Sequence, residues 1–77
     1  MKQRLAILGS TGSIGVQTLD IARENHDRFE VRTLTAHRNW EQLARQAREF
    51  DVDTVVIADE QFYTPLCEAL ADTETNV

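Results

Sequence analysis

The chain has 77 residues, of which 42% are hydrophobic and 27% charged, a composition typical of a globular protein rather than a disordered one. Its 13 acidic and 8 basic residues give a net charge of −5 without a basic cluster, which argues against nucleic-acid binding. Cys67 is the only cysteine, and the apolar run of residues 5–8 is too short for a signal peptide or a membrane span, so we expect a cytoplasmic protein.

Strands and helices are predicted to alternate from the start of the chain. Residues 4–8, "RLAIL", form a nearly continuous apolar run that ends at Gly9, which is typical of a strand covered on both faces. Residues Ser13–Glu24 contain no proline and carry apolar side chains at helical spacing, which predicts a helix. Residues Phe29–Ala36 are rich in β-branched side chains and begin with an alternating pattern, so they predict a second strand.

The clearest helix is predicted at Trp40–Phe50. Five side chains recur there at the spacing of one helix face: Trp40, Leu43, Ala44, Ala47 and Phe50. The remaining polar positions are expected to face outward: Glu41, Arg45, Gln46 and Arg48. Asn39 stands at the N-cap position, and Gln42 follows three residues later in the position of a capping box.

A third strand and a third helix complete the pattern. Residues 54–58, "TVVIA", predict a buried strand, and Asp59 is expected to cap a helix that runs to about Ala71. Because an interior proline removes a backbone hydrogen bond, the regular part of this helix is expected to begin at Thr64 or Pro65. Four carboxylates near the strand are interpreted as solvated turn residues rather than metal ligands: Asp51, Asp53, Asp59 and Glu60.

This β-α-β-α-β-α order predicts an α/β fold in which three parallel strands are arranged in the order 3-2-1. Such a unit is half of a doubly wound, Rossmann-like nucleotide-binding sheet. In the complete fold the first strand lies in the middle and pairs with a fourth strand, which this sequence does not supply. We therefore expect residues 1–77 to be the amino-terminal part of a longer nucleotide-binding domain.

The turn after the first strand carries the strongest functional signal. Gly9, Gly12 and Gly15 follow the spacing G-x-x-G-x-x-G, a variant of the dinucleotide fingerprint in which backbone and helix N-terminus approach a pyrophosphate. Three hydroxyls in this segment are expected to be able to donate to phosphate oxygens: Ser10, Thr11 and Ser13. Ser13 is also a candidate helix N-cap. The alternative is a glycine turn used only for tight strand-to-helix packing.

The segment after the second strand bears on the choice of cofactor. NAD-preferring folds place an acidic side chain about 20 residues after the glycine turn, but residues 33–39 read "TLTAHRN" and contain none. Arg38 offers a planar cationic fork suited to a 2′-phosphate, with Asn39 and His37 beside it, so NADPH is the expected cofactor. The alternative roles are surface charge for Arg38, a helix cap for Asn39 and a solvated loop residue for His37.

Two stretches together resemble a known family. "AILGSTGSIGVQTLDIARENHDRFEV" and the later "LTAHRN" are similar to the amino terminus of the 1-deoxy-D-xylulose 5-phosphate reductoisomerases, and GSTGSIG-x-x-x-L-D is the most specific motif. The resemblance covers essentially the whole chain and implies that Thr11, Gly12, Ser13 and Ile14 contact NADPH. Arg38 and Asn39 also match the family, whereas His37 replaces its usual glycine.

The resemblance implies an enzyme that isomerises and reduces 1-deoxy-D-xylulose 5-phosphate, a phosphorylated keto sugar, to 2-C-methyl-D-erythritol 4-phosphate. It also implies a divalent metal, Mg or Mn, and a homodimer in the full-length protein. The metal ligands and the substrate site are expected beyond Val77, so no catalytic or metal-binding residue is assigned here. We expect the isolated 77 residues to be inactive and to bind NADPH weakly or not at all.

Two other readings of the sequence remain open at this point. Semialdehyde and acyl-phosphate reductases also begin with a strand, a similar glycine turn and a helix, and they also use NADPH. A nucleotide-sensing Rossmann module of a regulator would look the same over this length. Residues further along the polypeptide would separate the three readings. An Asp-x-Glu metal motif would support the reductoisomerase, an isolated catalytic cysteine the semialdehyde or acyl-phosphate reductase, and a nucleic-acid-binding or effector module the regulator.

Overall fold

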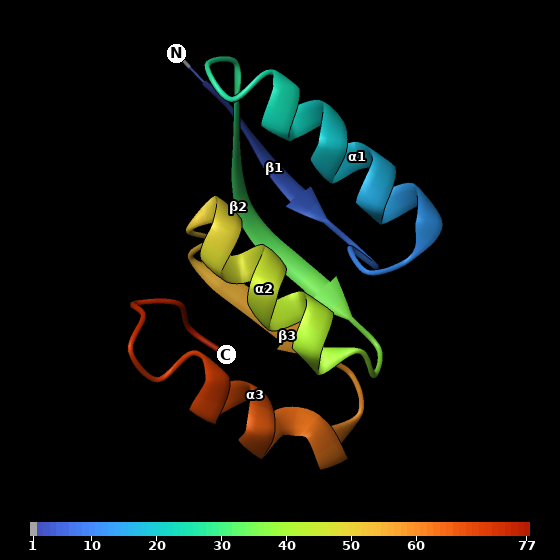
Figure 1. The fold of residues 1–77 in the computed structure, drawn as a ribbon, viewed down its shortest axis with the longest axis vertical. Helices are drawn as coiled ribbons and strands as arrows, with labels where there is room; N and C mark the ends of the chain where they lie inside the picture. The colour runs from blue at the N-terminus through green and yellow to red at the C-terminus, as the bar shows by residue number, and fades with distance from the viewer. Residues whose placement is uncertain (1) are drawn as a thin grey trace.

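The structure, a computed structural model that describes residues 2–77, has strands and helices in the predicted order (Figure 1). The elements are β1 Gln3–Ile7, α1 Ser13–Glu24, β2 Phe29–Ala36, α2 Trp40–Phe50, β3 Thr54–Ile57, the short 3-10 helix η1 Glu60–Phe62 and α3 Tyr63–Ala69. The bounds of α1, β2 and α2 are those expected from the sequence. The strand β1 begins and ends one residue earlier than expected, and β3 ends at Ile57.

The three strands form one parallel sheet in which β2 lies between β1 and β3. This is the 3-2-1 order predicted from the alternation of elements. The register of β1 and β2 shifts between Leu5, which pairs with Val31, and Ala6, which pairs with Thr33. Because the strands are parallel, their carboxyl ends all lie at one edge of the sheet, and the segments that follow β1 and β2 meet there.

The core lies between the sheet and the helices. Helices α1 and α2 both pack against β2. Figure 1 shows α2 in front of β2 and β3, and α3 below α2 in the view. Leu19 of α1, Leu34 of β2 and Leu43 of α2 are almost completely buried in this layer. Leu66 of α3 is also fully buried, and α3 packs against α2. Removing these side chains from water is the main force that holds the helices on the sheet.

The second face of the sheet is not covered by any element within residues 2–77. Successive side chains of a strand point to opposite faces, so Val55 is fully buried while its neighbour Val56 is 50% exposed. In β1, Ile7 is buried but Ala6 is exposed, and Leu8 after the strand is 79% exposed. The expectation that β1 is covered on both faces is therefore wrong for this part of the chain, because the helices described here pack on one face only.

The predicted cap of α2 is confirmed, and the predicted cap of α1 is wrong. The Asn39 side chain accepts a hydrogen bond from the backbone N–H of Gln42 at 3.3 Å and so caps α2. The Gln42 side chain accepts from the Asn39 side-chain amide at 2.9 Å, which replaces the return bond of a capping box. In α1 the N-cap is Gly12, without a side-chain bond, and Ser13 is the first helical residue rather than the cap.

The third helix begins earlier and ends earlier than expected. Asp59 caps the helical segment as predicted, since its carboxylate accepts from the Gln61 N–H at 3.1 Å. That turn is the 3-10 helix η1, and α3 follows it from Tyr63 to Ala69 rather than to Ala71. Pro65 is accommodated inside α3 because it lies in the first turn, where a backbone N–H has no intrahelical partner.

The last residues return to the sheet, a pairing that the sequence pattern does not predict. Asn76 forms a parallel bridge with Thr54 at the start of β3. Its carbonyl accepts from Val55 N at 2.8 Å, and its N–H donates to Asp53 O, also at 2.8 Å. Across residues 2–77, no helix is both long and apolar enough to cross a bilayer.

Candidate nucleotide-binding site

All six residues predicted to bind the cofactor lie at the carboxyl edge of the sheet. The turn of residues 8–12 connects β1 to α1, and residues 37–39 connect β2 to α2. The first connection and the start of α1 supply Thr11, Gly12, Ser13 and Ile14, and the second supplies Arg38 and Asn39. Thr11 is half-buried and the other five are exposed. Because β1 and β2 are neighbours in the sheet, the structure brings the two groups to the same edge.

The structure explains why glycine is needed at two of the three positions in the turn. Gly9 has a φ of +72°, a left-handed conformation that other residues rarely adopt. A Cβ on Gly15 would overlap the Gly9 carbonyl oxygen and would lie 2.6 Å from Ser10 Cα, so only glycine lets α1 approach the turn. Gly12 has an extended backbone, with φ −80° and ψ 170°, and the nearest atom to an added Cβ would be 3.4 Å away. The fold thus requires Gly9 and Gly15 but has no such need of Gly12.

Backbone bonds hold the turn against β2. Ser10 N donates to the carbonyl oxygen of Thr35 at 2.8 Å, and Gly9 N donates to the Thr35 hydroxyl at 3.0 Å. Within the turn, Gly12 N donates to Gly9 O at 3.0 Å, and Gly12 O accepts the first helical bond, from Val16 N, at 2.9 Å. The turn therefore has a defined shape that depends on the sheet as well as on its own residues.

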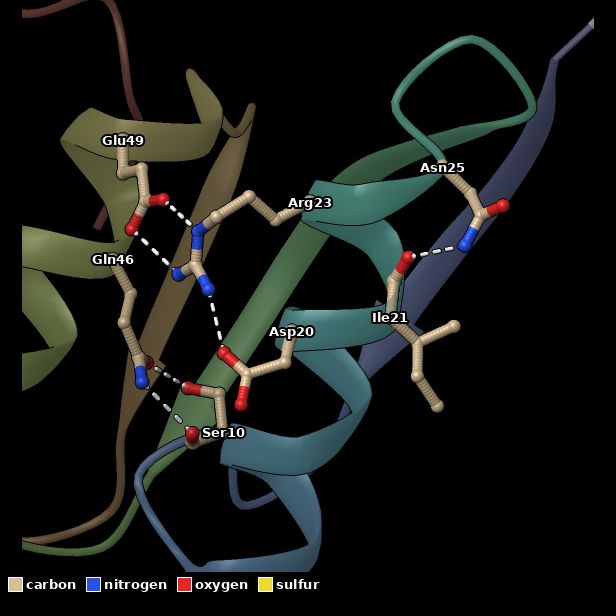
Figure 2. A network of polar contacts seen from close by, with 7 residues as sticks. All are labelled: Ser10, Asp20, Ile21, Arg23, Asn25, Gln46 and Glu49. Carbon is tan, nitrogen blue, oxygen red and sulfur yellow. Dashed lines mark hydrogen bonds and ion pairs between the residues drawn. The ribbon is translucent and has the colours of Figure 1, made fainter.

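Ser10 is fully buried and does not face the exposed side of the turn. Its hydroxyl donates to Gln46 Oε1 at 2.7 Å, and its carbonyl oxygen accepts from Gln46 Nε2 at 2.9 Å (Figure 2). The expectation that the Ser10 hydroxyl is available to a phosphate is therefore wrong. Gln46, expected on the outer face of α2, is only 7% exposed. Its spacing, three residues after Leu43 and four before Phe50, places it beside the apolar face and is the signal that could have identified it.

The N-terminus of α1 can accept an anion. The first N–H groups of a helix have no intrahelical partner, and here neither a capping side chain nor an acidic residue of the first turn satisfies or neutralises them. Gly12 and Ser13 are exposed, and Ile14 is 79% exposed. This arrangement of backbone donors at a positive helix end is suited to a phosphate group.

Arg38 extends from the second connection. Its Nε donates to Asp59 Oδ2 at 3.1 Å, and its side chain is 64% exposed. The Asp59 backbone N–H also donates to the His37 carbonyl at 3.0 Å, so the segment after β3 supports the segment after β2. The backbone hydrogen bond from Gln61, followed by the bond from Arg38, lowers the pKa of the Asp59 carboxyl and keeps it ionised.

Asn39 and His37 have plainer surroundings than Arg38. The Asn39 side-chain oxygen accepts a hydrogen bond from Gln42 N, which confirms that Asn39 is a helix cap. Its side-chain nitrogen donates one hydrogen to Gln42 Oε1, so the second hydrogen remains for another acceptor. His37 is exposed and uses its carbonyl to bind Asp59. Contact of Asn39 or His37 with a cofactor stays a prediction.

Two of the four carboxylates near β3 have arginine partners. Asp53 pairs with Arg32, Asp59 pairs with Arg38, and Asp51 ends α2 with a left-handed backbone at φ 49°. In the part of the chain that the structure describes, no three His, Cys, Asp or Glu side chains are grouped as a metal site would require. Asp53 and Asp59 instead bind arginine side chains.

Comparison with known sequences identifies relatives along the whole chain. The family model described as 1-deoxy-D-xylulose 5-phosphate reductoisomerase matches residues 5–77. A curated protein of that name from Porphyromonas gingivalis is 58% identical over 72 residues, which cover 94% of this chain and 19% of that protein. Another, from Phocaeicola vulgatus, is 49% identical over 77 residues, which cover 100% of this chain and 20% of that protein. The chain thus spans about a fifth of the length of these relatives.

Solved structures agree with these sequence relatives. The reductoisomerase from Zymomonas mobilis in complex with NADPH matches 99% of this chain and 20% of its own, with a TM-score of 0.95 and 42% identity. A reductoisomerase in complex with NADPH, fosmidomycin and magnesium matches 96% of this chain and 18% of its own, with a TM-score of 0.90 and 34% identity. These matches favour the predicted family over the semialdehyde reductases and the regulators. The chain belongs to the 1-deoxy-D-xylulose 5-phosphate reductoisomerase family.

Proposed function

We propose that residues 1–77 are the amino-terminal part of an NADPH-binding domain. The enzyme that contains them would isomerise 1-deoxy-D-xylulose 5-phosphate and reduce the product to 2-C-methyl-D-erythritol 4-phosphate. Family membership supports the reaction, and relatives solved with NADPH support the cofactor. The exposed apolar side chains on the second face of the sheet, Ala6 and Val56, support a larger domain that covers this face.

Gly12 is the observation that carries the cofactor proposal. Neither its backbone angles nor the packing around it requires glycine, and a serine or aspartate at an N-cap would stabilise the helix better. A ligand that approaches the main chain closely does require it, because a Cβ would hold a phosphate away from the N–H groups. We therefore place the NADPH pyrophosphate against the backbone of Thr11, Gly12, Ser13 and Ile14.

Arg38 is proposed to bind the 2′-phosphate that distinguishes NADPH from NADH. Only its Nε is bonded within residues 2–77, to Asp59, so the terminal Nη groups are available as a planar fork. Asp59 holds the base of the guanidinium while the fork extends into solvent. Asn39 would donate the remaining hydrogen of its side-chain amide to the same phosphate. The exposed side chain of Ile14 would pack against an apolar part of the cofactor.

The remaining chemistry is assigned to residues outside this chain. NADPH would supply the hydride, and a divalent metal, Mg or Mn, would polarise the oxygens of the phosphorylated keto sugar. A relative is solved with magnesium, but the metal ligands of this enzyme are proposed to lie beyond Val77. A cytoplasmic location and a homodimer stay predictions.

Binding of NADPH to the full-length enzyme tests the proposal. Calorimetry should show one NADPH site per subunit, and Gly12→Ala should weaken binding by about tenfold to a hundredfold, since charge-assisted bonds to the pyrophosphate would be lost. Because a Cβ fits at this position, the variant should lose only the small stability difference between a glycine and an alanine N-cap, about 1 kcal/mol or less. Unchanged NADPH affinity in Gly12→Ala would contradict the proposed site.

A further inference from the structure

We infer that Gln46, on helix α2, is a positioning residue that sets the shape of the NADPH-binding turn. The inference rests on the proposed function, because it assumes that the turn meets the cofactor. Gln46 itself lies in the buried layer and is 7% exposed, so it is not proposed to touch NADPH.

The contact between Gln46 and Ser10 is reciprocal and buried (Figure 2). Gln46 Oε1 accepts from the Ser10 hydroxyl at 2.7 Å, and Gln46 Nε2 donates to the Ser10 carbonyl at 2.9 Å. Ser10 is 0% exposed, so water does not compete for these bonds. One side chain of α2 therefore holds both the side chain and the main chain of a residue in the turn between β1 and α1.

The carbonyl bond fixes the direction of a neighbouring donor. The Ser10 carbonyl and the Thr11 N–H belong to one planar peptide group, and the described chain contains no cis peptide bond. In a trans peptide the N–H points opposite to the C=O. By holding the Ser10 carbonyl toward α2, Gln46 turns the Thr11 N–H away from α2. Thr11 is the first of the four residues proposed to bind the pyrophosphate.

The other side of Ser10 is fixed separately. Ser10 N donates to Thr35 O at 2.8 Å, so the peptide before Ser10 is held by β2 and the peptide after it by α2. Loss of the Gln46 amide would free only the second peptide. We therefore expect weaker cofactor binding from a Gln46 variant, and a smaller effect from Ser10→Ala, which keeps the carbonyl bond and removes only the hydroxyl.

The test compares variants of the full-length enzyme. Gln46→Ala should raise the KM and the dissociation constant for NADPH by about tenfold while kcat changes by less than about threefold. Ser10→Ala loses one of the two bonds and leaves only Gln46 Oε1 without its partner, so its unfolding temperature should also fall, but its NADPH affinity should change by less than about threefold. Ala47→Gly, at the next position of α2, is the control for destabilisation without loss of the contact.

Gln46→Glu adds a readout that simple destabilisation would not move. As a carboxylate, Glu would repel the Ser10 carbonyl, whereas the protonated acid can donate to it as glutamine does. Burial should raise the pKa of this carboxyl. We therefore expect the ratio of NADPH affinities, Gln46→Glu to wild type measured at the same pH, to rise toward one as the pH is lowered.

The outcomes separate this inference from the proposed function. If Gln46→Ala weakens NADPH binding no more than Ala47→Gly does, while Gly12→Ala still weakens it strongly, the role of Gln46 is wrong and the cofactor site stands. An equal loss of affinity in Ser10→Ala and Gln46→Ala would likewise overturn the role of the carbonyl bond. If Gly12→Ala binds NADPH as the wild type does, both proposals fail.

Discussion

Arg23 of α1 forms a two-point ion pair with Glu49 of α2, which joins the two helices that cover the sheet (Figure 2). Arg23 Nη2 lies 2.9 Å from Glu49 Oε1, and the guanidinium also donates to Asp20 at 2.6 Å. The Arg23 Cζ atom is 5.4 Å from the centroid of the Phe50 ring. The hydrogen bond from Arg23 lowers the pKa of Glu49 below its ordinary value of 4.5.

This pair predicts a pH-dependent contribution to stability. Since the pKa of Glu49 is lower in the folded state, the contribution is complete above the unfolded pKa and is lost as the pH falls through the folded pKa. The difference in unfolding temperature between the wild type and Glu49→Gln should be largest near pH 7 and should shrink as the pH falls through the lowered pKa of Glu49. Both side chains are about half exposed, so the difference should be small and should shrink in about 1 M salt.

A matched control uses another exposed glutamate. Glu68 lies on α3 and makes no ion pair within residues 2–77. Glu68→Gln should give an unfolding temperature that follows the wild type at each pH. If the destabilisation in Glu49→Gln does not shrink as the pH is lowered from about 7 into the acidic range, the ion pair does not stabilise the fold.

The glycines of the turn predict two contrasting variants. Gly15→Ala places a Cβ against Gly9 O and Ser10 Cα, so it should destabilise the protein by about 1–3 kcal/mol or more through overpacking. Gly12→Ala should cost only about 1 kcal/mol or less, because its Cβ meets an ordinary contact and the only loss is that alanine is a poorer N-cap than glycine. It should lose cofactor affinity instead. Thermal unfolding of both variants checks this. A wild-type unfolding temperature in Gly15→Ala would contradict the close approach of α1 to the turn.

Arg38 predicts the cofactor preference. Arg38→Glu removes the cationic fork and adds a charge that repels a phosphate, so the ratio of kcat/KM for NADPH to that for NADH should fall by at least about tenfold. Arg45→Glu makes the same charge change at an exposed position of α2 away from the second connection. It should leave the ratio close to that of the wild type. If Arg38→Glu keeps the preference, another group reads the 2′-phosphate.

Periodic features were predictable from the sequence, and contacts between distant elements were not. The i, i+3, i+4 recurrence from Trp40 to Phe50 sufficed for α2, because one buried stripe defines a helix. The position of the glycine turn followed from the strand before it and the helix after it. The prediction that Gln46 faces outward is wrong, because a polar side chain beside an apolar stripe can be buried when another element supplies its hydrogen-bond partner. That partner, Ser10, is 36 residues away.

The same limit explains the other differences. Pro65 argued for a late helix start, but a 3-10 turn before α3 placed it where its missing N–H costs nothing. The apolar run of β3 has no alternation that shows which face the helices leave open, so the expected buried strand has Val56 exposed on the open face. The return of Asn76 to β3 depends on backbone pairing, to which side-chain patterns give little guide.

A crystal structure of the full-length enzyme with NADPH tests the central claim most directly. We expect the pyrophosphate at the turn after β1, with main-chain N–H groups of residues 11–14 at about 3 Å from its oxygens. We also expect the 2′-phosphate beside the terminal nitrogens of Arg38. A cofactor bound elsewhere, with no contact between this turn and the pyrophosphate, would contradict the account.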